Sequence, residues 1–411
     1  MVIVYGVGER GKKCIEKKVE KKEVFVIYDN DRRKWGKRVS GKEIIDLSTF
    51  LSLIEKEACE IICTIRNPNA LYFLKDTIGK LGSKHKVYNY EEDGSVEEVN
   101  LDQIPPFSVN FEKLHENSMK TFSENAEYFR QMGNMKAYHH ALEYIERKDK
   151  MPLAPELYGL ELTNYCNLAC PNCPNSTCKR EKGYVSETTF KEILKNIPPR
   201  RDNYFSVHGL GEPLMHPNFL EYLEQIVERG IIPVVSTNGL LLDDDMINRM
   251  LTILNMAEKS RVLISFHTRK SVEAWVRSMK WIEQHDGTIE MFGTILEHNE
   301  KDAECWLREC GIDIKNNKNI RKVTSHSFAG NVAGRRSVYC DVEIANRHRN
   351  CYYINRNLTD VAWDGRLKAC CLDAEVSGEV GTIYDIENAR INQNGYLLCH
   401  TCDPDWTSDF Q

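Results

Sequence analysis

The sequence has no apolar run that approaches the roughly 18 residues a membrane-spanning helix needs. It also has no excess of one charge sign, because 55 Lys and Arg against 61 Asp and Glu leave a net charge of -6. Such a balance provides no general attraction to nucleic acid or to anionic membranes. The first apolar segment is not preceded by a basic stretch, and neither an internal repeat nor a low-complexity tract is visible. We therefore expect a cytoplasmic protein without nucleic-acid or membrane partners.

Cysteine, in contrast, is abundant, with 15 residues among 411. A reducing cytoplasm does not favour a disulfide framework, so clustered cysteines indicate metal ligands or catalytic thiols. The chain is also long enough for two to four domains, at roughly 100 to 200 residues each.

The first half of the chain divides into two parts. Apolar strand patterns at 2–6, 24–28 and 60–65 alternate with helical patterns, which predicts a small Rossmann-like domain over residues 1–100. Pro105-Pro106 breaks this alternation, and the polar stretch that follows has helical spacing. We expect a helical connector over residues 101–153.

The alternation of strands and helices resumes in the second half. Apolar runs separated by helical segments occur at 157–162, 204–207, 231–235, 262–266, 291–296 and, more weakly, 321–325. Six such units predict a partial (β/α)6 barrel over residues 154–334. Residues 335–411 are rich in cysteine and turn residues and are expected to form a separate small module. The predicted fold class is therefore α/β.

A cysteine motif follows the first barrel strand. Cys166, Cys170 and Cys173 have the spacing CxxxCxxC. Three thiolates on one loop can bind three irons of a cubane cluster, which leaves the fourth iron open to a small molecule. A zinc site is the alternative, but zinc usually takes four protein ligands in structural sites and no second pair of cysteines lies in this loop.

This loop resembles the signature of the radical S-adenosylmethionine (SAM) superfamily. Further segments at barrel strand ends resemble the family's SAM-binding motifs: the GxGEP form at Gly209, Gly211, Glu212 and Pro213, a ribose-contacting segment at Ser236 and Asn238, Ser265 after the fourth strand, and Asn172 before the third cysteine. The resemblance implies that Cys166, Cys170 and Cys173 hold a 4Fe–4S cluster, that SAM binds its open iron, and that reductive cleavage yields a 5′-deoxyadenosyl radical. It also implies a flavodoxin- or ferredoxin-type electron donor.

His267, after the fourth barrel strand, is a candidate catalytic or substrate-facing residue. In this family a polar residue often stands near the SAM carboxylate at this place. A lone histidine is also commonly a structural residue that is satisfied by hydrogen bonds, and the sequence leaves both roles open.

The C-terminal cysteines form a second group. Cys351, Cys370, Cys399 and Cys402, with the Asp364-Gly365 turn between them, resemble the twitch form of the SPASM extension. This resemblance implies one auxiliary 4Fe–4S cluster, with Cys371 able to replace Cys370 as a ligand. A structural zinc knuckle is the alternative. Cys178, Cys340 and Cys371 are possible hydrogen-atom donors if the reaction is an epimerisation.

The N-terminal domain contains a GxGxxG turn at Gly6, Gly8 and Gly11, and Asp29 ends the next strand. A turn of this kind places backbone N–H groups at a helix N-terminus, where a diphosphate can bind, and the carboxylate can bind a ribose. The segment also resembles small domains found beside sugar-modifying enzymes. Two alternatives are a domain that only mediates contacts and a dehydrogenase, although no catalytic partner for hydride transfer is visible.

Together these features predict a radical SAM enzyme that oxidises or epimerises a carbohydrate-type small molecule, a sugar or nucleotide-sugar. A peptide-modifying maturase is the first alternative, and a metal-stabilised binding module without turnover is the second.

Overall fold

The computed structural model describes residues 1–66, 69–78, 84–104, 108–201, 204–257, 259–323, 329, 332 and 351–402. Their contacts divide the chain into two compact units. The N-terminal unit comprises Met1–Ser108, and a second unit, here called the barrel unit, begins at Val109.

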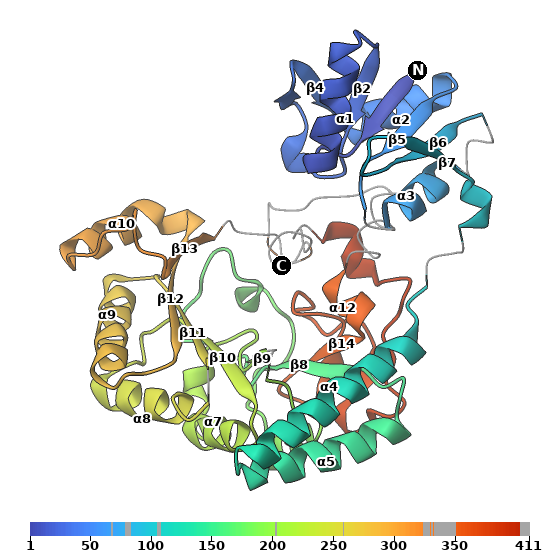
Figure 1. Ribbon diagram of the computed structural model, residues 1–411. Coiled ribbons are helices and arrows are strands. Elements are labelled where there is room, and N and C mark those ends of the chain that lie inside the picture. Colours follow the sequence, from blue (N-terminus) through green and yellow to red (C-terminus); the bar gives the residue numbers. More distant parts are fainter. Residues whose placement is uncertain are drawn as a thin grey trace. The chain divides into compact units, whose positions relative to one another are not determined.

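The N-terminal unit is built on a mainly parallel sheet with helices on both faces (Figure 1). Ile15 of α1 packs into one apolar core, and Phe50 and Phe73 of α2 and α3 pack into another. Both faces of the central strands are therefore buried, which explains why these strands are continuous apolar runs in the sequence. The strands, in sheet order, are β3 (Arg38–Val39), β4 (Lys42–Ile45), β2 (Phe25–Tyr28), β1 (Val2–Tyr5), β5 (Glu60–Cys63), β6 (Lys86–Tyr90) and β7 (Val96–Val99). The helices are α1 (Glu9–Glu20), α2 (Leu47–Lys56) and α3 (Asn69–Ile78).

The barrel unit contains a nine-stranded sheet whose strands β8 to β13 are parallel to their neighbours. The six predicted strand runs correspond to these six strands, so the expected α/β fold with two mainly parallel sheets is confirmed. The strands, in sheet order, are β13 (Ile320–Val323), β12 (Glu290–Leu296), β11 (Arg261–Ser265), β10 (Ile232–Thr237), β9 (Tyr204–Ser206), β8 (Glu156–Leu160), β14 (Leu358–Val361), β15 (Arg366–Lys368) and β16 (Gly381–Thr382).

Helices between the barrel strands lie on the outer side of the curved sheet (Figure 1). Each presents an apolar stripe to the sheet, as Phe219, Leu223 and Ile226 of α7 do. The helices are α6 (Glu187–Lys195), α7 (Phe219–Glu228), α8 (Asp244–Leu254), α9 (Arg269–Gln284) and α10 (Glu300–Glu309).

The stretch before the barrel forms a helical hairpin of α4 (Phe111–Gln131) and α5 (Met135–Lys150). Gly133 makes the turn between them, with a positive φ of 70° that a residue without a side chain adopts readily. The hairpin contacts the loop that follows α6: Asn125 Nδ2 donates to the Pro199 carbonyl at 2.8 Å, and His140 Nε2 lies 3.0 Å from the Ile197 carbonyl.

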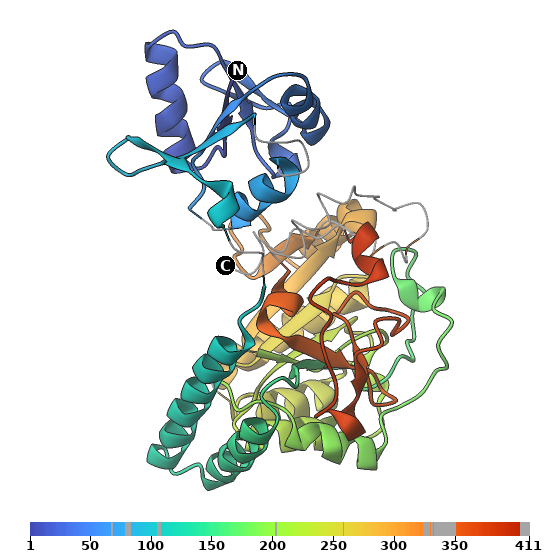
Figure 2. The ribbon, with the colours of Figure 1, turned by 90° about the vertical axis from the view of Figure 1, so that its right-hand side faces the viewer.

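The C-terminal segment extends the barrel sheet at the β8 edge (Figure 2). Its strand β14 pairs in parallel with β8, and its apolar residues Leu367 and Ile383 belong to the same core as Leu157 and Phe190 of the barrel. The sequence had suggested a separate module from residue 335. Within the described residues, the segment and the barrel instead share a sheet and a core, while the predicted domain boundaries stay predictions. A short helix, α12 (Tyr352–Arg356), precedes β14.

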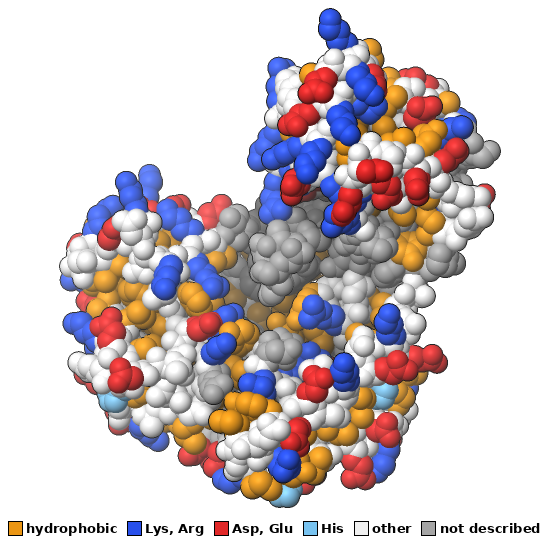
Figure 3. Space-filling model, in the orientation of Figure 1, with side chains coloured by type: hydrophobic (Ala, Val, Ile, Leu, Met, Phe, Trp, Pro, Cys, Tyr) orange, Lys and Arg blue, Asp and Glu red, His pale blue; other side chains and the backbone are white. Residues whose placement is uncertain are grey.

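Basic and acidic side chains are interspersed over the face shown in Figure 3. In the part of the chain that the structure describes, no helix is both long and apolar enough to cross a membrane.

Candidate functional site

The loop after β8 carries the three predicted cluster cysteines. The first residues of this loop are held by hydrogen bonds of the Thr163 side chain. Its Oγ1 donates to the Gly183 carbonyl at 2.7 Å and accepts the Tyr165 N–H at 3.0 Å. Cys166, Cys170 and Cys173 are half-buried, and all three line one cavity, here called the cysteine cavity.

Burial raises the pKa of each of the three thiols, and the other two cysteines add to this effect at Cys170, whose pKa is raised to about 11. At neutral pH a bound cation is therefore needed to keep these groups as thiolates, because only a nearby positive charge offsets the cost of burying them as anions. The donor set thus fits an iron–sulfur cluster chemically. Among the described residues, no three His, Cys, Asp or Glu side chains are grouped as a site for a single metal ion.

Two glycines bring the main chain of the GxGEP segment close to the cysteine loop. Gly211 has a φ of 92°, and a Cβ atom there would lie 2.5 Å from the Thr163 carbonyl oxygen and 2.6 Å from that of Tyr165. A Cβ atom on Gly209 would lie 2.6 Å from the Cβ of Glu161. Because only glycine fits at both places, the segment forms a wall of the cavity with its backbone exposed to a ligand.

Glu212 connects this segment to the loop after β10. Its carboxylate accepts hydrogen bonds from Thr237 Oγ1 at 2.8 Å, from the Asn238 N–H at 2.8 Å and from the Leu214 N–H at 3.2 Å. The side chain is almost fully buried, and burial raises its pKa. The sequence resemblance assigned Glu212 to SAM binding. The structure adds that most of its hydrogen-bonding capacity is used to hold two loops together.

The cysteine cavity has a volume of about 270 Å³, close to the lower end of the range for small-molecule sites. It gathers the predicted SAM-contacting residues from the carboxyl ends of neighbouring strands, with the exception of Pro213, which is buried beside it. The predicted residues that line it are Gly209, Gly211, Glu212, Ser236, Asn238, Ser265, His267 and Asn172.

His267 also faces this cavity, with Nδ1 3.5 Å from the Cys170 sulfur. Burial, together with the neighbouring His298, lowers its pKa to about 4, so the imidazole is neutral at pH 7. Its catalytic role stays a prediction. Leu296, His298 and Val323 also line the cavity and are among the residues that the sequence did not point to. Because they lie at or just after the ends of β12 and β13, the rule that barrel sites form at strand ends would have found them.

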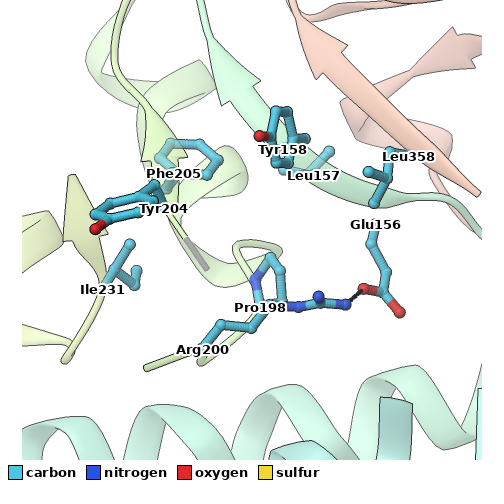
Figure 4. A pocket seen from close by; sticks show the side chains of 9 residues that line it. All are labelled: Glu156, Leu157, Tyr158, Pro198, Arg200, Tyr204, Phe205, Ile231 and Leu358. Atoms are coloured by element: carbon cyan, nitrogen blue, oxygen red, sulfur yellow. Dashed lines mark hydrogen bonds and ion pairs between the residues drawn. The ribbon is translucent and has the colours of Figure 1, made fainter. Parts of the chain in front are cut away.

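A smaller cavity lies at the opposite end of β8 (Figure 4). Its volume of about 10 Å³ is sufficient for roughly one water molecule. Glu156 and Arg200 form an ion pair at this cavity. It is too small for a cofactor or a substrate.

Comparison with known proteins agrees with this geometry. Residues 160–297, which include all three loop cysteines and the strand-end segments, match the profile of the Radical SAM superfamily. The chain carries a radical SAM domain. It is 35% identical over 94 residues to the tungsten-containing aldehyde ferredoxin oxidoreductase cofactor-modifying protein of Pyrococcus furiosus, which covers 22% of this chain and 26% of that protein. It is 31% identical over 106 residues to the mycofactocin maturase MftC of Mycobacterium tuberculosis, which covers 26% of this chain and 27% of that protein.

The chain thus spans about a quarter of the length of these relatives. Among solved structures, it is similar to BtrN in complex with AdoMet and 2-DOIA, with a TM-score of 0.38 and 16% identity over 58% of this chain and 83% of that one. It is also similar to Streptococcus suis SuiB bound to the precursor peptide SuiA, with a TM-score of 0.38 and 13% identity over 66% of this chain and 70% of that one.

Outside the radical SAM domain, the C-terminal cysteines lie near one another. Burial raises the pKa of Cys370, and the thiols of Cys371, Cys402 and Cys351 raise it further. At Cys399, burial raises the pKa to about 11, and Cys351 contributes to the shift. Electrostatic interactions thus connect Cys351 with Cys370 and Cys399, and Cys370 with Cys402, and all four residues are half-buried. In the part of the chain that the structure describes, no three of these cysteines are grouped as a site for a single metal ion.

The surroundings of Cys370 and Cys371 differ. The pKa of Cys370 is raised by burial, by the adjacent Cys371, and then by the thiols of Cys402 and Cys351. The pKa of Cys371 is raised to about 12 by burial and by Asp360, with a smaller contribution from Cys402, and its thiol is hydrogen-bonded with Tyr353. These contacts favour Cys370 as the ligand, while the choice itself stays a prediction. Cys340 lies outside the described residues.

In the N-terminal unit, the glycine turn and Asp29 come together as predicted from the sequence. Gly6 has a φ of 103°, and a Cβ on Gly11 would lie 2.1 Å from the Gly6 carbonyl oxygen, whereas Gly8 at the start of α1 has open space beside it. The Asp29 carboxylate accepts the Val7 N–H at 2.9 Å and the Asp31 N–H at 2.9 Å, and Lys34 pairs with it. It therefore stabilises the turn itself, and nucleotide binding stays a prediction.

Proposed function

We propose that this protein is an enzyme that reductively cleaves SAM and uses the radical so formed to abstract a hydrogen atom from its substrate. The observation that carries the proposal is the cysteine cavity, where Cys166, Cys170 and Cys173 face the glycine-bearing segment and the ends of β10 and β11 within the matched domain. When bound, the cluster and SAM supply the electron and the hydrogen-abstracting group.

The chain's own residues provide the binding site. Cys166, Cys170 and Cys173 would hold the cluster, and the main chain at Gly209 and Gly211 lines the cavity in which the SAM methionine group would bind. The loop after β10 is fixed from two sides. The Asn238 N–H donates to the Glu212 carboxylate at 2.8 Å, and Asn238 Nδ2 donates to Asn167 Oδ1 of the cysteine loop at 2.7 Å. A flavodoxin- or ferredoxin-type protein would deliver the electron.

The direct test of this function is SAM cleavage. Cys166→Ala should abolish dithionite-dependent formation of 5′-deoxyadenosine by anaerobically reconstituted protein. Cys178→Ala is a matched control, because Cys178 follows the same loop but its thiol is directed to the Ala374 carbonyl at 3.4 Å. Cleavage by the Cys166→Ala protein at the wild-type rate would contradict the proposal and leave a binding module without turnover.

For the substrate, the sequence relatives favour a peptide. The MftC proteins, which are about 30% identical over the matched quarter of their length, are named as maturases. We therefore place peptide modification before the carbohydrate substrate expected from the sequence. The Asp29 contacts also weigh against that expectation, because the carboxylate meant for a ribose already has three donors.

A labelling experiment distinguishes the two substrate classes. A fully deuterated peptide fraction or nucleotide-sugar fraction from the source cells is added separately, and transfer of deuterium into 5′-deoxyadenosine is measured by mass spectrometry. Deuterium from the peptide fraction alone supports the maturase function, whereas deuterium from the nucleotide sugars alone restores the carbohydrate function.

We further assign one auxiliary 4Fe–4S cluster to Cys351, Cys370, Cys399 and Cys402. The support is the electrostatic interaction of Cys370 with Cys402 and Cys351, and of Cys399 with Cys351. An auxiliary cluster there can accept the second electron from a substrate radical, which gives oxidation. If a thiol such as Cys178 or Cys371 instead returns a hydrogen atom, the outcome is epimerisation.

A further inference from the structure

A group of buried charges lies at the end of β8, next to the radical SAM site but outside the lining of its cavity. Glu161 directly follows β8 and is 1% exposed. Arg180 Nη2 donates to both carboxylate oxygens of Glu161, at 2.8 and 2.9 Å. Lys368 Nζ, also 1% exposed, lies 4.0 Å from Glu161 Oε2. One carboxylate is therefore shared between two cations.

Glu161 holds the segment that carries the SAM-binding glycines. Its Oε2 accepts the Leu210 N–H at 3.1 Å, between Gly209 and Gly211. The same oxygen would lie 3.0 Å from a Cβ on Gly209, so the carboxylate packs directly against this main chain. A hydrogen bond to an ionised carboxylate is stronger than a neutral one. The charge on Glu161 therefore contributes to the position of the cavity wall.

Both cations are connected to the C-terminal segment. Lys368 belongs to it, and Arg180 is hydrogen-bonded to it. Lys368 is the last residue of β15, two positions before Cys370, and it lies opposite Asp360 in the β14–β15 ladder. Arg180 Nε donates to the Ala374 carbonyl at 2.7 Å, a few residues after Cys371. The charge group thus connects the segment of the auxiliary cysteines to the SAM-binding segment through two side chains.

We propose that Glu161, Arg180 and Lys368 are positioning residues for SAM, which make the SAM affinity of the cysteine cavity depend on the C-terminal segment. This inference rests on the proposed function, since it assumes that SAM binds there. Removing one member of a buried charge group leaves its partners uncompensated, and they move or recruit water. Here the group that moves first is the Glu161 carboxylate, and the Leu210 main chain moves with it.

The alternative is that these three residues only stabilise the fold. Their net contribution to stability can then be small, because buried ion pairs often contribute little. The two roles differ in what they change. If the residues only stabilise the fold, changing them alters the melting temperature alone. If they position SAM, changing them weakens SAM binding at an unchanged iron content.

The experiment measures the dissociation constant of SAM for the anaerobically reconstituted, unreduced full-length protein, together with iron content and melting temperature. The variants are Lys368→Met, which removes one charge but keeps most of the side chain, Glu161→Gln, and Arg180→Lys, which keeps the charge but not the two-pronged contact. Glu156→Gln is the matched control, because Glu156 is a buried carboxylate on the same strand that pairs with Arg200 at the end shown in Figure 4.

We expect Lys368→Met and Glu161→Gln to weaken SAM binding about tenfold, within the range of coupling between contacting residues. The double variant should bind no more weakly than Glu161→Gln alone, because Lys368 acts through that carboxylate. Glu156→Gln should lower the melting temperature without changing SAM affinity.

If Lys368→Met and Arg180→Lys bind SAM as wild-type protein does, the positioning role is wrong, whatever their melting temperatures. These two variants keep the test decisive if Glu161→Gln fails to fold. Absence of SAM binding by the wild-type protein would overturn the proposed function and this inference with it. Wild-type binding that no variant changes would overturn this inference only.

Discussion

Three histidines of the barrel unit, the buried His140 and the half-buried His208 and His267, are neutral at pH 7. Burial lowers the pKa of His140, His208 and His267 to about 4 from the ordinary value of 6.5. Unfolded chains, in which these groups recover a pKa near 6.5, bind more protons than the folded protein between about pH 6.5 and pH 4. Stability is therefore fully present above this window and is lost as the pH falls through it.

His140 offers the cleanest test of this pH dependence, because it lies on α5 rather than in the cysteine cavity. We predict that His140→Gln, which keeps a donor for the Ile197 carbonyl, reduces the loss of unfolding free energy between pH 7 and pH 5 by about 2 kcal/mol. Urea unfolding at the two pH values measures the difference. An identical loss in both proteins would show that His140 does not titrate on unfolding.

A second prediction at the residue scale concerns which of the adjacent Cys370 and Cys371 is a cluster ligand. The pKa of Cys370 is raised by burial and by the thiols of Cys371, Cys402 and Cys351, whereas Cys371 contacts Tyr353 and lies near Asp360 as well as Cys402. We predict that Cys370→Ser lowers the iron content of reconstituted protein by about four irons, the content of one cubane. Cys371→Ser should keep the wild-type iron content, and the reverse pattern would transfer the ligand assignment to Cys371.

At the scale of elements, the radical SAM site depends on loops that approach one another at their backbones. Gly211 belongs to the loop after β9, and its Cα faces the carbonyl oxygens of the loop after β8, with the Glu212 N–H donating to the Tyr165 carbonyl at 2.8 Å. Any side chain at Gly211 would separate these two loops. Each loop is therefore positioned by its neighbour as well as by its own strand.

We predict that Gly211→Ala abolishes SAM binding and destabilises the barrel unit. Gly133→Ala is the matched control, since Gly133 has a positive φ of 70° but nothing within 4 Å of a Cβ. It should cost only the backbone strain, roughly 1 to 2 kcal/mol, and leave SAM binding intact. Thermal unfolding and SAM affinity of both variants provide the measurement. Equal effects on SAM binding would show that strain, rather than the close approach of the loops, is responsible.

The elements that the sequence predicts well are the parallel strands. Most of them are largely buried and form short apolar runs that can be recognised without partners, whereas the largely exposed β13 gives only a weak run. The β12 run at 291–296, for example, corresponds to Glu290–Leu296. The residues at strand ends could then be assigned to a site, because parallel strands place their carboxyl ends together.

Pairings between distant segments could not be predicted in this way. No local pattern indicates that Leu358 pairs with Glu156 in the β14–β8 ladder, or that Lys368 approaches Glu161. Trp363 packs against Gly183, where a Cβ would lie 2.4 Å from its ring, and this contact is also invisible in the sequence. Such contacts depend on the complete fold, which explains why the C-terminal segment appeared separate in the sequence.

At the scale of the whole molecule, the N-terminal unit has its own sheet and cores, while the barrel and the C-terminal segment share theirs. The apolar core of the barrel unit runs from Ala154 to Ile391 and includes Ala369, next to Cys370. The C-terminal cysteines that the structure describes and the cysteine cavity are therefore parts of one folded body. A substitution at one of these places is expected to change the structure at the other.

The central claim is that Cys166, Cys170 and Cys173 hold the cluster that cleaves SAM. The most direct test compares iron content and dithionite-dependent 5′-deoxyadenosine formation in wild-type protein and in the variant with all three cysteines changed to alanine. We predict about eight irons in the wild type and about four in the variant, as expected for two cubanes and one, with cleavage lost in the variant. A variant that keeps the wild-type iron content and still cleaves SAM would contradict this account.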